Sequence, residues 1–185
     1  NQDFNINLAD GKVQIIKENQ GEKWVIHLVD TGLNTMTGGR LQKLSSLISK
    51  KTLMMTYGDG VSDVNLDKLV KYHGDNKGLV TLTAVRPPAR FGALEFEGDK
   101  IRSFKEKSFL HEGWINGGFF VIQKEALSYI KEDVMWEHDP MEMLTAEGKV
   151  CGYRHEGFWQ CMDTSRDLRY LETLWTHNQA PWKTW

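Results

Sequence analysis

The sequence has few cysteines, no excess of charge of one sign and no long hydrophobic run. Its 185 residues contain two cysteines, which excludes the disulfide framework of small secreted domains. The 23 basic and 25 acidic residues leave a net charge of -2, which argues against a binder of nucleic acids or membrane surfaces. No apolar run is long enough for a signal peptide or a membrane span. These absences predict a soluble, cytoplasmic protein.

Internal repeats, low-complexity stretches and linkers are also missing. A chain of this length can bury a substantial core without metal or disulfide support. We therefore expect a single domain over residues 1–185. Within it we expect an antiparallel insertion around 91–107 and a C-terminal helical tail over 165–185.

Short apolar runs alternate with amphipathic segments in the first half of the chain. The runs are rich in β-branched residues, whereas the segments between them have apolar residues spaced three and four apart. The predicted elements are strands over 12–18, 24–30, 52–57 and 78–85, and helices from near Gly39 and over 65–73. Apolar strands that alternate with amphipathic helices are typical of an α/β fold, with a mostly parallel mixed sheet and helices on both faces.

The second half of the chain adds antiparallel structure. Two alternating runs flank the turn Glu97–Lys100 and predict a hairpin. The apolar run 114–123 contains Gly117 and Gly118, where a bulge or a close backbone approach is expected. The remaining predicted elements are a helix over 124–130, a helix from the N-cap Asp139 through Pro140 to Gly148, strands over 150–155 and 157–163, and a helix over 166–176.

Asp59 stands between two glycines at the end of the predicted strand 52–57. Ligands of parallel sheets bind beyond the carboxyl ends of the strands. A carboxylate at such an end suits a magnesium ion that is shared with phosphates. Aspartate and glycine are also ordinary turn residues, and for Asp59 taken alone the turn role is favoured.

Asp163 ends a second predicted strand, directly before a helix that begins near Ser165. Two aspartates at strand ends could hold one Mg²⁺ and leave positions for phosphate and water. The alternative is a helix N-cap role shared with Thr164. The sequence leaves open whether Asp59 and Asp163 converge.

Arg40 follows two glycines at a predicted helix start. Free backbone N–H groups and the helix dipole favour an anion there, and a guanidinium could bind the same phosphate. The alternative is a helix start with no bound phosphate.

Seven short segments occur in a fixed order between residue 24 and the last residue. They are LVDTGLNTMTGGRL, TYGDGV, RFGAL, FKEK, INGGFF, GFWQCMDT and APWKTW. In this order they resemble the glucose-1-phosphate cytidylyltransferase family of the sugar nucleotidyltransferases. The resemblance implies a Rossmann-like fold of the nucleotide-diphospho-sugar transferase type. It also implies the Mg²⁺-dependent reaction of CTP with glucose 1-phosphate, which gives CDP-glucose and pyrophosphate.

The resemblance also assigns roles by motif matching. Asp59 and Asp163 would bind the metal, and both would be catalytic together with Arg40 and Lys107. The implied nucleotide-binding residues are Thr35, Arg40 and Gly58, and the implied sugar-binding residues are Gly92, Glu106, Lys107, Asn116 and Gly117. One departure is Ser108, which stands where the family's Glu-Lys-Pro motif has proline.

A larger departure concerns the family's N-terminal loop of the type Gly-Gly-x-Gly-Thr-Arg-Leu, which these 185 residues do not contain. We therefore expect an N-terminally truncated member, either a fragment or a homo-oligomer that covers the exposed apolar surface. The alternative function is a non-catalytic remnant that keeps a sugar-phosphate pocket or an assembly role. A glycosyltransferase with an Asp-x-Asp pair is disfavoured, because Asp59 has glycines on both sides and Asp63 lies four residues away.

Overall fold

A computed structural model of the chain describes residues 3–17, 24–87, 93–105 and 113–184. Contacts group the chain into two compact units, Asn1–Asp30 and Thr31–Trp185. In the first unit β1 (Asp3–Ile6) pairs antiparallel with β2 (Val13–Lys17). The single domain expected over residues 1–185 stays a prediction.

The predicted strand over 24–30 is wrong, because these residues have no regular secondary structure. β-Propensity produces a strand only where a neighbouring backbone completes the hydrogen-bond ladder. Within the described part of the first unit, β2 forms its ladder with β1. The apolar side chains of the segment are therefore exposed, from 41% for Val29 to 94% for Leu28.

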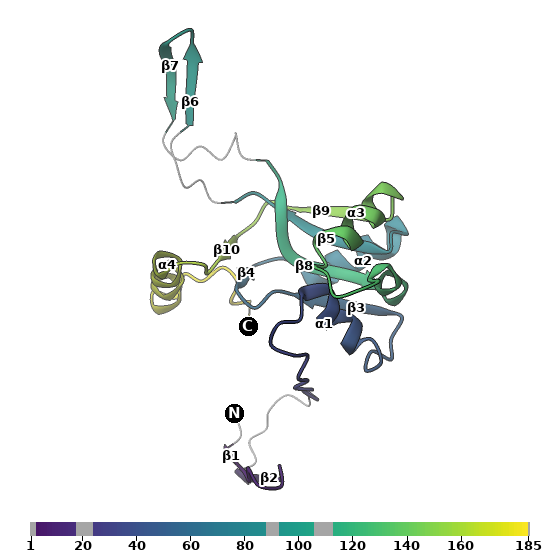
Figure 1. The fold of residues 1–185 in the computed structure, drawn as a ribbon. Helices are drawn as coiled ribbons and strands as arrows, with labels where there is room; N and C mark the ends of the chain where they lie inside the picture. The colour runs from purple at the N-terminus through teal and green to yellow at the C-terminus, as the bar shows by residue number, and fades with distance from the viewer. Residues whose placement is uncertain (1–2, 18–23, 88–92, 106–112, 185) are drawn as a thin grey trace. The chain divides into compact units, whose positions relative to one another are not determined.

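The second unit is built on a four-stranded sheet, which runs through its centre in Figure 1. The strand order is β3 (Thr52–Thr56), β8 (Ile115–Gln123), β5 (Val80–Val85) and β9 (Val150–His155). β8 is antiparallel to both of its neighbours, and β5 is parallel to β9. The predicted mixed α/β sheet is confirmed. β3, β5 and β9 run in the same direction, and β8 runs in the opposite direction between β3 and β5. Of the three ladders in this sheet, the one between β5 and β9 is therefore parallel.

One face of this sheet packs against α1 (Thr37–Leu44), α3 (Asp139–Ala146) and the 3-10 helix η2 (Lys124–Tyr129). The buried core on this face consists of Leu41, Val80, Phe120, Ile122, Ala126, Leu127, Ile130, Trp136 and Leu144. Removal of these side chains from water is the main favourable term in forming the unit.

The opposite face packs against α2 (Leu66–Asn76). The buried His73 of α2 has one ring nitrogen 2.9 Å from Thr81 Oγ1 and the other 2.9 Å from Gln123 Nε2. Val80 belongs to the core of the first face and Thr81 points to α2, as the alternation of side chains along a strand requires. The prediction of helices on both faces is confirmed.

Two helix predictions need correction. In place of the helix expected over 124–130, Lys124–Tyr129 form the 3-10 helix η2, and the N–H of its C-cap Ile130 donates to Leu127 O at 3.2 Å. So short a connector closes with i to i−3 bonds. The N-cap of α3 is His138 instead of Asp139, since Glu142 N–H donates to His138 O at 2.9 Å. Asp139 is the first helical residue, where its charge suits the helix dipole.

Of the remaining elements, the hairpin and the last helix follow the sequence pattern, whereas no strand was predicted over Gly60–Ser62. The expected hairpin is formed by β6 (Ala93–Glu97) and β7 (Lys100–Lys105). A separate antiparallel pair joins β4 (Gly60–Ser62) to β10 (Trp159–Cys161), and α4 (Ser165–Thr176) follows. None of the described helices combines the length and hydrophobicity that crossing a membrane requires.

Candidate functional site

The pairing of β4 with β10 brings Asp59 and Asp163 close along the backbone. Gly60 pairs with Cys161, and Met162 N–H donates to the carbonyl oxygen of Asp59 at 2.8 Å. Asp59 directly precedes β4, and Asp163 follows β10 by two residues. The two predicted metal ligands therefore flank one antiparallel ribbon, although they lie far apart in the sequence.

Thr164, and not Asp163, caps helix α4. Asp167 N–H donates to Thr164 Oγ1 at 3.2 Å, and Thr164 N–H donates to Asp167 Oδ2 at 3.1 Å. This reciprocal capping box satisfies the helix start without Asp163. Asp163 Oδ2 instead accepts a hydrogen bond from Cys161 Sγ at 3.3 Å. The capping alternative for Asp163 is therefore removed.

The donor set at this ribbon fits a magnesium ion. Mg²⁺ in proteins is held by one or two carboxylates and completes its coordination with water and phosphate oxygens. Among the residues that the structure describes, no group of three or more His, Cys, Asp or Glu side chains could hold a metal ion. Asp59 and Asp163 would supply two such carboxylates, and their role as metal ligands stays a prediction.

Tyr57 fixes the chain just before Asp59. Its hydroxyl donates to Glu137 Oε1 at 2.6 Å and accepts from Asn116 Nδ2 at 3.2 Å. Its backbone N–H donates to Gly118 O at 3.3 Å. Burial, followed by the hydrogen bond to Glu137, raises the pKa of Tyr57 above its usual value. The hydroxyl therefore stays protonated at neutral pH and can serve as a fixed anchor.

Gly117 and Gly118 form the expected bulge in β8 and pack closely against protein atoms. The register of β5 with β8 shifts between Leu82 and Ala84. A Cβ on Gly117 would lie 2.7 Å from Val85 Cγ1. At Gly118, where φ is +79°, a Cβ would lie 2.6 Å from Tyr57 Cδ2, so only glycine fits there.

The bulge of β8 also contacts the segments that carry the two aspartates. Asn116 binds Tyr57, which lies two residues before Asp59. The carbonyl oxygen of Gly117 accepts a hydrogen bond from Trp159 Nε1 at 2.8 Å, and Trp159 opens β10. The predicted sugar-binding residues of β8 are thus hydrogen-bonded to Tyr57 and Trp159, which lie two residues before Asp59 and four residues before Asp163.

A second link holds β4 next to β10. His155 Nε2 lies 2.8 Å from Asp63 Oδ1. The backbone N–H of Asp63 and the hydroxyl of Ser62 both donate to Phe158 O, at 3.2 Å and 2.8 Å. These contacts anchor the far end of the ribbon that Asp59 and Asp163 flank.

Arg40 and Thr35 lie in a separate cluster at the start of α1. The Arg40 guanidinium donates to Thr31 Oγ1 at 2.5 Å and to Leu33 O at 3.1 Å. The Thr35 hydroxyl donates to Thr31 O at 2.5 Å and accepts from Lys43 Nζ at 3.0 Å. In this structure both predicted nucleotide-binding side chains tie the loop 31–35 to α1.

The glycines before Arg40 have a structural explanation. A Cβ on Gly38 would lie 2.6 Å from Val134 O, and the Gly38 N–H donates to that oxygen at 3.0 Å. Met36 N–H donates to Asp133 Oδ1 at 2.9 Å. Protein groups thus occupy donors that a phosphate could have used, and Asp133 supplies a negative charge at the helix start. The nucleotide role of Arg40 stays a prediction.

The other predicted residues are placed as follows. Gly58 faces open space, because a Cβ there would meet no atom within 4 Å. Gly92, Glu106 and Lys107 lie outside the residues that the structure describes.

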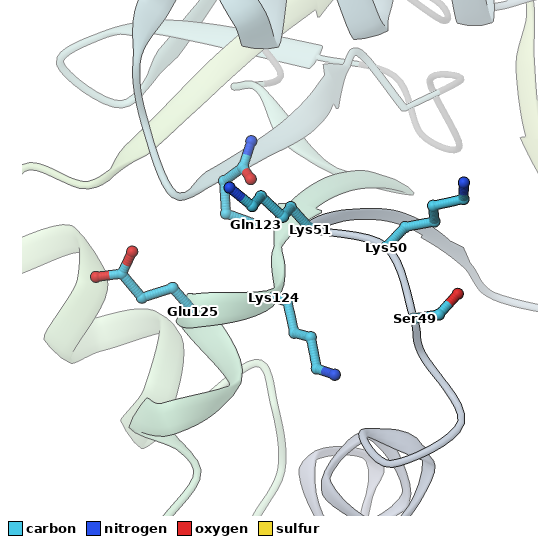
Figure 2. Close-up of a pocket in the computed structure, with 6 residues that line it drawn as sticks. All are labelled: Ser49, Lys50, Lys51, Gln123, Lys124 and Glu125. Carbon is cyan, nitrogen blue, oxygen red and sulfur yellow. The ribbon is translucent and has the colours of Figure 1, made fainter.

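A cavity of about 450 Å³ lies at the other end of β3 and β8, where Thr52 pairs with Gln123. Its lining residues are Ser49, Lys50, Lys51, Gln123, Lys124 and Glu125. Figure 2 shows that Lys50, Lys51 and Lys124 point in different directions. Lys124 Nζ donates to Ile48 O at 2.6 Å. Because the lysines do not converge, this cavity is a poor anion site.

Comparison with known proteins identifies the family to which the chain belongs. Residues 10–162 match the family model described as nucleotidyl transferase, and the chain belongs to that family. It is 40% identical over 185 residues to a glucose-1-phosphate cytidylyltransferase of Salmonella typhi, covering 99% of this chain and 72% of that protein. It is 35% identical over 179 residues to a probable glucose-1-phosphate cytidylyltransferase of Bacillus subtilis (strain 168), covering 96% and 69%.

Solved structures support the fold. A putative glucose-1-phosphate thymidylyltransferase from Bacillus anthracis has a TM-score of 0.56 at 16% identity, covering 77% of this chain and 62% of that one. HddC from Yersinia pseudotuberculosis has a TM-score of 0.54 at 20% identity, covering 74% and 60%. The chain thus spans about three fifths of each of these two solved chains, and the predicted Rossmann-like fold class is confirmed.

Proposed function

We propose that this chain transfers a cytidylyl group from CTP to glucose 1-phosphate, forming CDP-glucose and releasing pyrophosphate. The observation that carries the proposal is that Asp59 and Asp163 lie at the same end of the β4–β10 ribbon. Tyr57 and Trp159, which are close to them in the sequence, are hydrogen-bonded to Asn116 and Gly117. The 40% identity to a glucose-1-phosphate cytidylyltransferase supports this choice of substrates.

In this reaction a phosphate oxygen of glucose 1-phosphate attacks the α-phosphorus of CTP, and pyrophosphate leaves. Both reactants are anions, so the protein contributes positioning and charge neutralisation instead of covalent chemistry. Asp59 and Asp163 would hold Mg²⁺, which neutralises phosphate charge when bound.

The chain's own residues orient the sugar side of the site. Tyr57 and Gly118 use one donor and the acceptor of the Asn116 amide. The second N–H of that amide can bind a sugar hydroxyl. Roles for Gly92, Glu106 and Lys107 on the sugar side, and for Arg40 on the nucleotide side, belong to the same proposal.

The proposal also includes a homo-oligomeric, cytoplasmic enzyme. The support for self-association is the exposed apolar segment of the first unit, in which Trp24, Val25 and Leu28 are 76%, 80% and 94% exposed. Apolar surface of this kind favours association.

The test is the release of pyrophosphate and the formation of CDP-glucose from CTP, glucose 1-phosphate and Mg²⁺. We expect the unaltered chain to form both products. Asp163→Asn lowers turnover at least about 100-fold, on the scale of losing one group that stabilises transition-state charge. Asp75→Asn, at an exposed position of α2, is the matched control and keeps full activity.

Undiminished pyrophosphate release by Asp163→Asn would remove Asp163 from the mechanism. Calorimetry that detects glucose 1-phosphate binding but no CTP binding would favour the non-catalytic alternative.

A further inference from the structure

Glu137 lies where three segments of the chain meet, and each of its carboxylate oxygens accepts a hydrogen bond from a hydroxyl group. Oε1 accepts from the Tyr57 hydroxyl at 2.6 Å, and Oε2 accepts from the Thr37 hydroxyl at 2.6 Å. Tyr57 directly follows β3, and Thr37 is the first residue of α1. One carboxylate therefore joins the strand that leads to Asp59 to the helix that carries Arg40.

The core fixes the backbone on which Glu137 lies. The preceding residue, Trp136, is fully buried, and its backbone N–H donates to Thr37 Oγ1 at 2.9 Å. The following residue, His138, is the N-cap of α3. Glu137 itself is half-buried. A side chain on a rigid, packed segment can hold other groups in a defined geometry.

The hydrogen bonds form a chain with one direction, which ends at Asn116. A carboxylate only accepts, so the proton of the Tyr57 hydroxyl is used on Glu137. The Tyr57 oxygen in turn accepts from Asn116 Nδ2 at 3.2 Å. Asn116 Oδ1 accepts from the Gly118 N–H at 2.9 Å, which fixes the same orientation of the amide. The second N–H of the exposed Asn116 amide is thereby left as a donor with a fixed direction.

A glutamine at position 137 has the size of glutamate but not its two acceptor oxygens. It carries one acceptor oxygen and one NH₂ group, so one of the two hydroxyls, of Tyr57 or of Thr37, would face a donor. An NH₂ group that faces Tyr57 would donate to the phenol oxygen and compete with Asn116 for it. Glu137→Gln therefore disturbs the chain of hydrogen bonds with little change of volume.

We propose that Glu137 is a positioning residue of the sugar site, which acts through Tyr57 to fix the orientation in which the Asn116 amide meets its ligand. The identity of that ligand, a sugar phosphate, rests on the proposed function, whereas the positioning rests on the hydrogen bonds. It follows that the effect of Glu137 on ligand binding requires Asn116.

The experiment is a calorimetric titration of the whole chain with glucose 1-phosphate, without CTP, in four forms: unaltered, Glu137→Gln, Asn116→Ala and the double variant. We expect Glu137→Gln to weaken binding about tenfold, on the scale of one lost hydrogen bond. We expect it to cause no further loss when Asn116→Ala is present, because the two substitutions interrupt one chain. Glu142→Gln, at an exposed position of α3, is the matched control and leaves the affinity unchanged.

The double variant separates positioning from a general effect on the fold. A loss of affinity of equal size in the presence and absence of Asn116, or no loss in Glu137→Gln, overturns the positioning role. Nuclear magnetic resonance gives a second readout in the absence of ligand. The side-chain amide signal of Asn116, assigned by its disappearance in Asn116→Ala, shifts in Glu137→Gln and not in Glu142→Gln. An Asn116 signal that ignores Glu137→Gln also overturns the role.

The outcome is separable from the proposed function. A chain that binds glucose 1-phosphate with the expected dependence on Glu137 but forms no CDP-glucose keeps the positioning role and loses the proposed function. A chain that forms CDP-glucose while Glu137→Gln changes neither the affinity nor the Asn116 signal loses the positioning role alone. An unaltered chain that binds no glucose 1-phosphate overturns both.

Discussion

Replacement of Tyr57 by phenylalanine removes one hydroxyl that joins three segments of the candidate site. That hydroxyl donates to Glu137 Oε1 at 2.6 Å and accepts from Asn116 Nδ2 at 3.2 Å. The ring itself keeps its edge-to-face contact with Phe120, with centroids 5.8 Å apart, so the substitution tests the hydrogen bonds alone.

The size of the effect follows from the partners. A hydrogen bond to a charged group contributes about 1.5–3 kcal/mol net. Tyr57 is half-buried, and Glu137 keeps its 2.6 Å hydrogen bond from the Thr37 hydroxyl, so the lower end of that range applies. We expect Tyr57→Phe to lower the free energy of unfolding by about 1.5 kcal/mol, which for a domain of this size is a decrease in Tm of about 3–6 °C.

The assay is urea unfolding of the chain with Tyr57→Phe, with Glu137→Gln and with both substitutions. Because the two side chains contact each other, we expect a coupling free energy of about 1 kcal/mol. Tyr170→Phe, at an exposed tyrosine of α4, is the control and leaves the stability unchanged. Additive effects of Tyr57→Phe and Glu137→Gln would refute the hydrogen bond as an energetic link.

Two further predictions concern stability. Gly118→Ala places a Cβ 2.6 Å from the Tyr57 ring at φ +79°, so we expect thermal melting to show a larger loss of stability than for Gly148→Ala. Gly148 has a similar φ of +68° but open space around it, and equal losses of stability in the two variants would contradict the steric explanation. Burial lowers the pKa of His73, so the unfolded state binds the proton more tightly and stability falls as the pH decreases below about 6.5. Measurement of the free energy of unfolding between about pH 7.5 and pH 5 tests this. We expect His73→Gln to reduce the dependence of that free energy on pH, and an unchanged dependence would contradict the prediction.

Local elements were predictable because their signals are local. The apolar runs at β3 and β5 and the spacing of apolar residues in α2 each identify an element within about ten residues. The capping of α4 by Thr164 and the end of α3 at Ala146, two residues before Gly148, follow from the chemistry of single residues.

The arrangement of the sheet was less predictable, because strand pairing depends on distant parts of the chain. The sequence of β8 does not reveal that it lies between β3 and β5 and runs against both. The segment 24–30 has the composition of a strand but no ladder. Composition measures how well side chains fit a pleated surface, and it does not supply the neighbouring backbone.

The same limit applies to the candidate site. Asp59 and Asp163 were identifiable as carboxylates at strand ends, and Tyr57 could have been noticed because it directly precedes the Gly-Asp-Gly turn. The partners of that site were not identifiable. Glu137 lies 80 residues from Tyr57 and Trp159 lies 42 residues from Gly117, so only the folded chain brings each pair together.

The most direct test of a metal ion shared by Asp59 and Asp163 is a count of bound Mn²⁺ by electron paramagnetic resonance in the presence of CTP. Mn²⁺ accepts the same oxygen ligands as Mg²⁺. We predict one tightly bound ion per chain, and loss of that tight binding in both Asp59→Asn and Asp163→Asn. Tight binding that survives either substitution would contradict a shared ion.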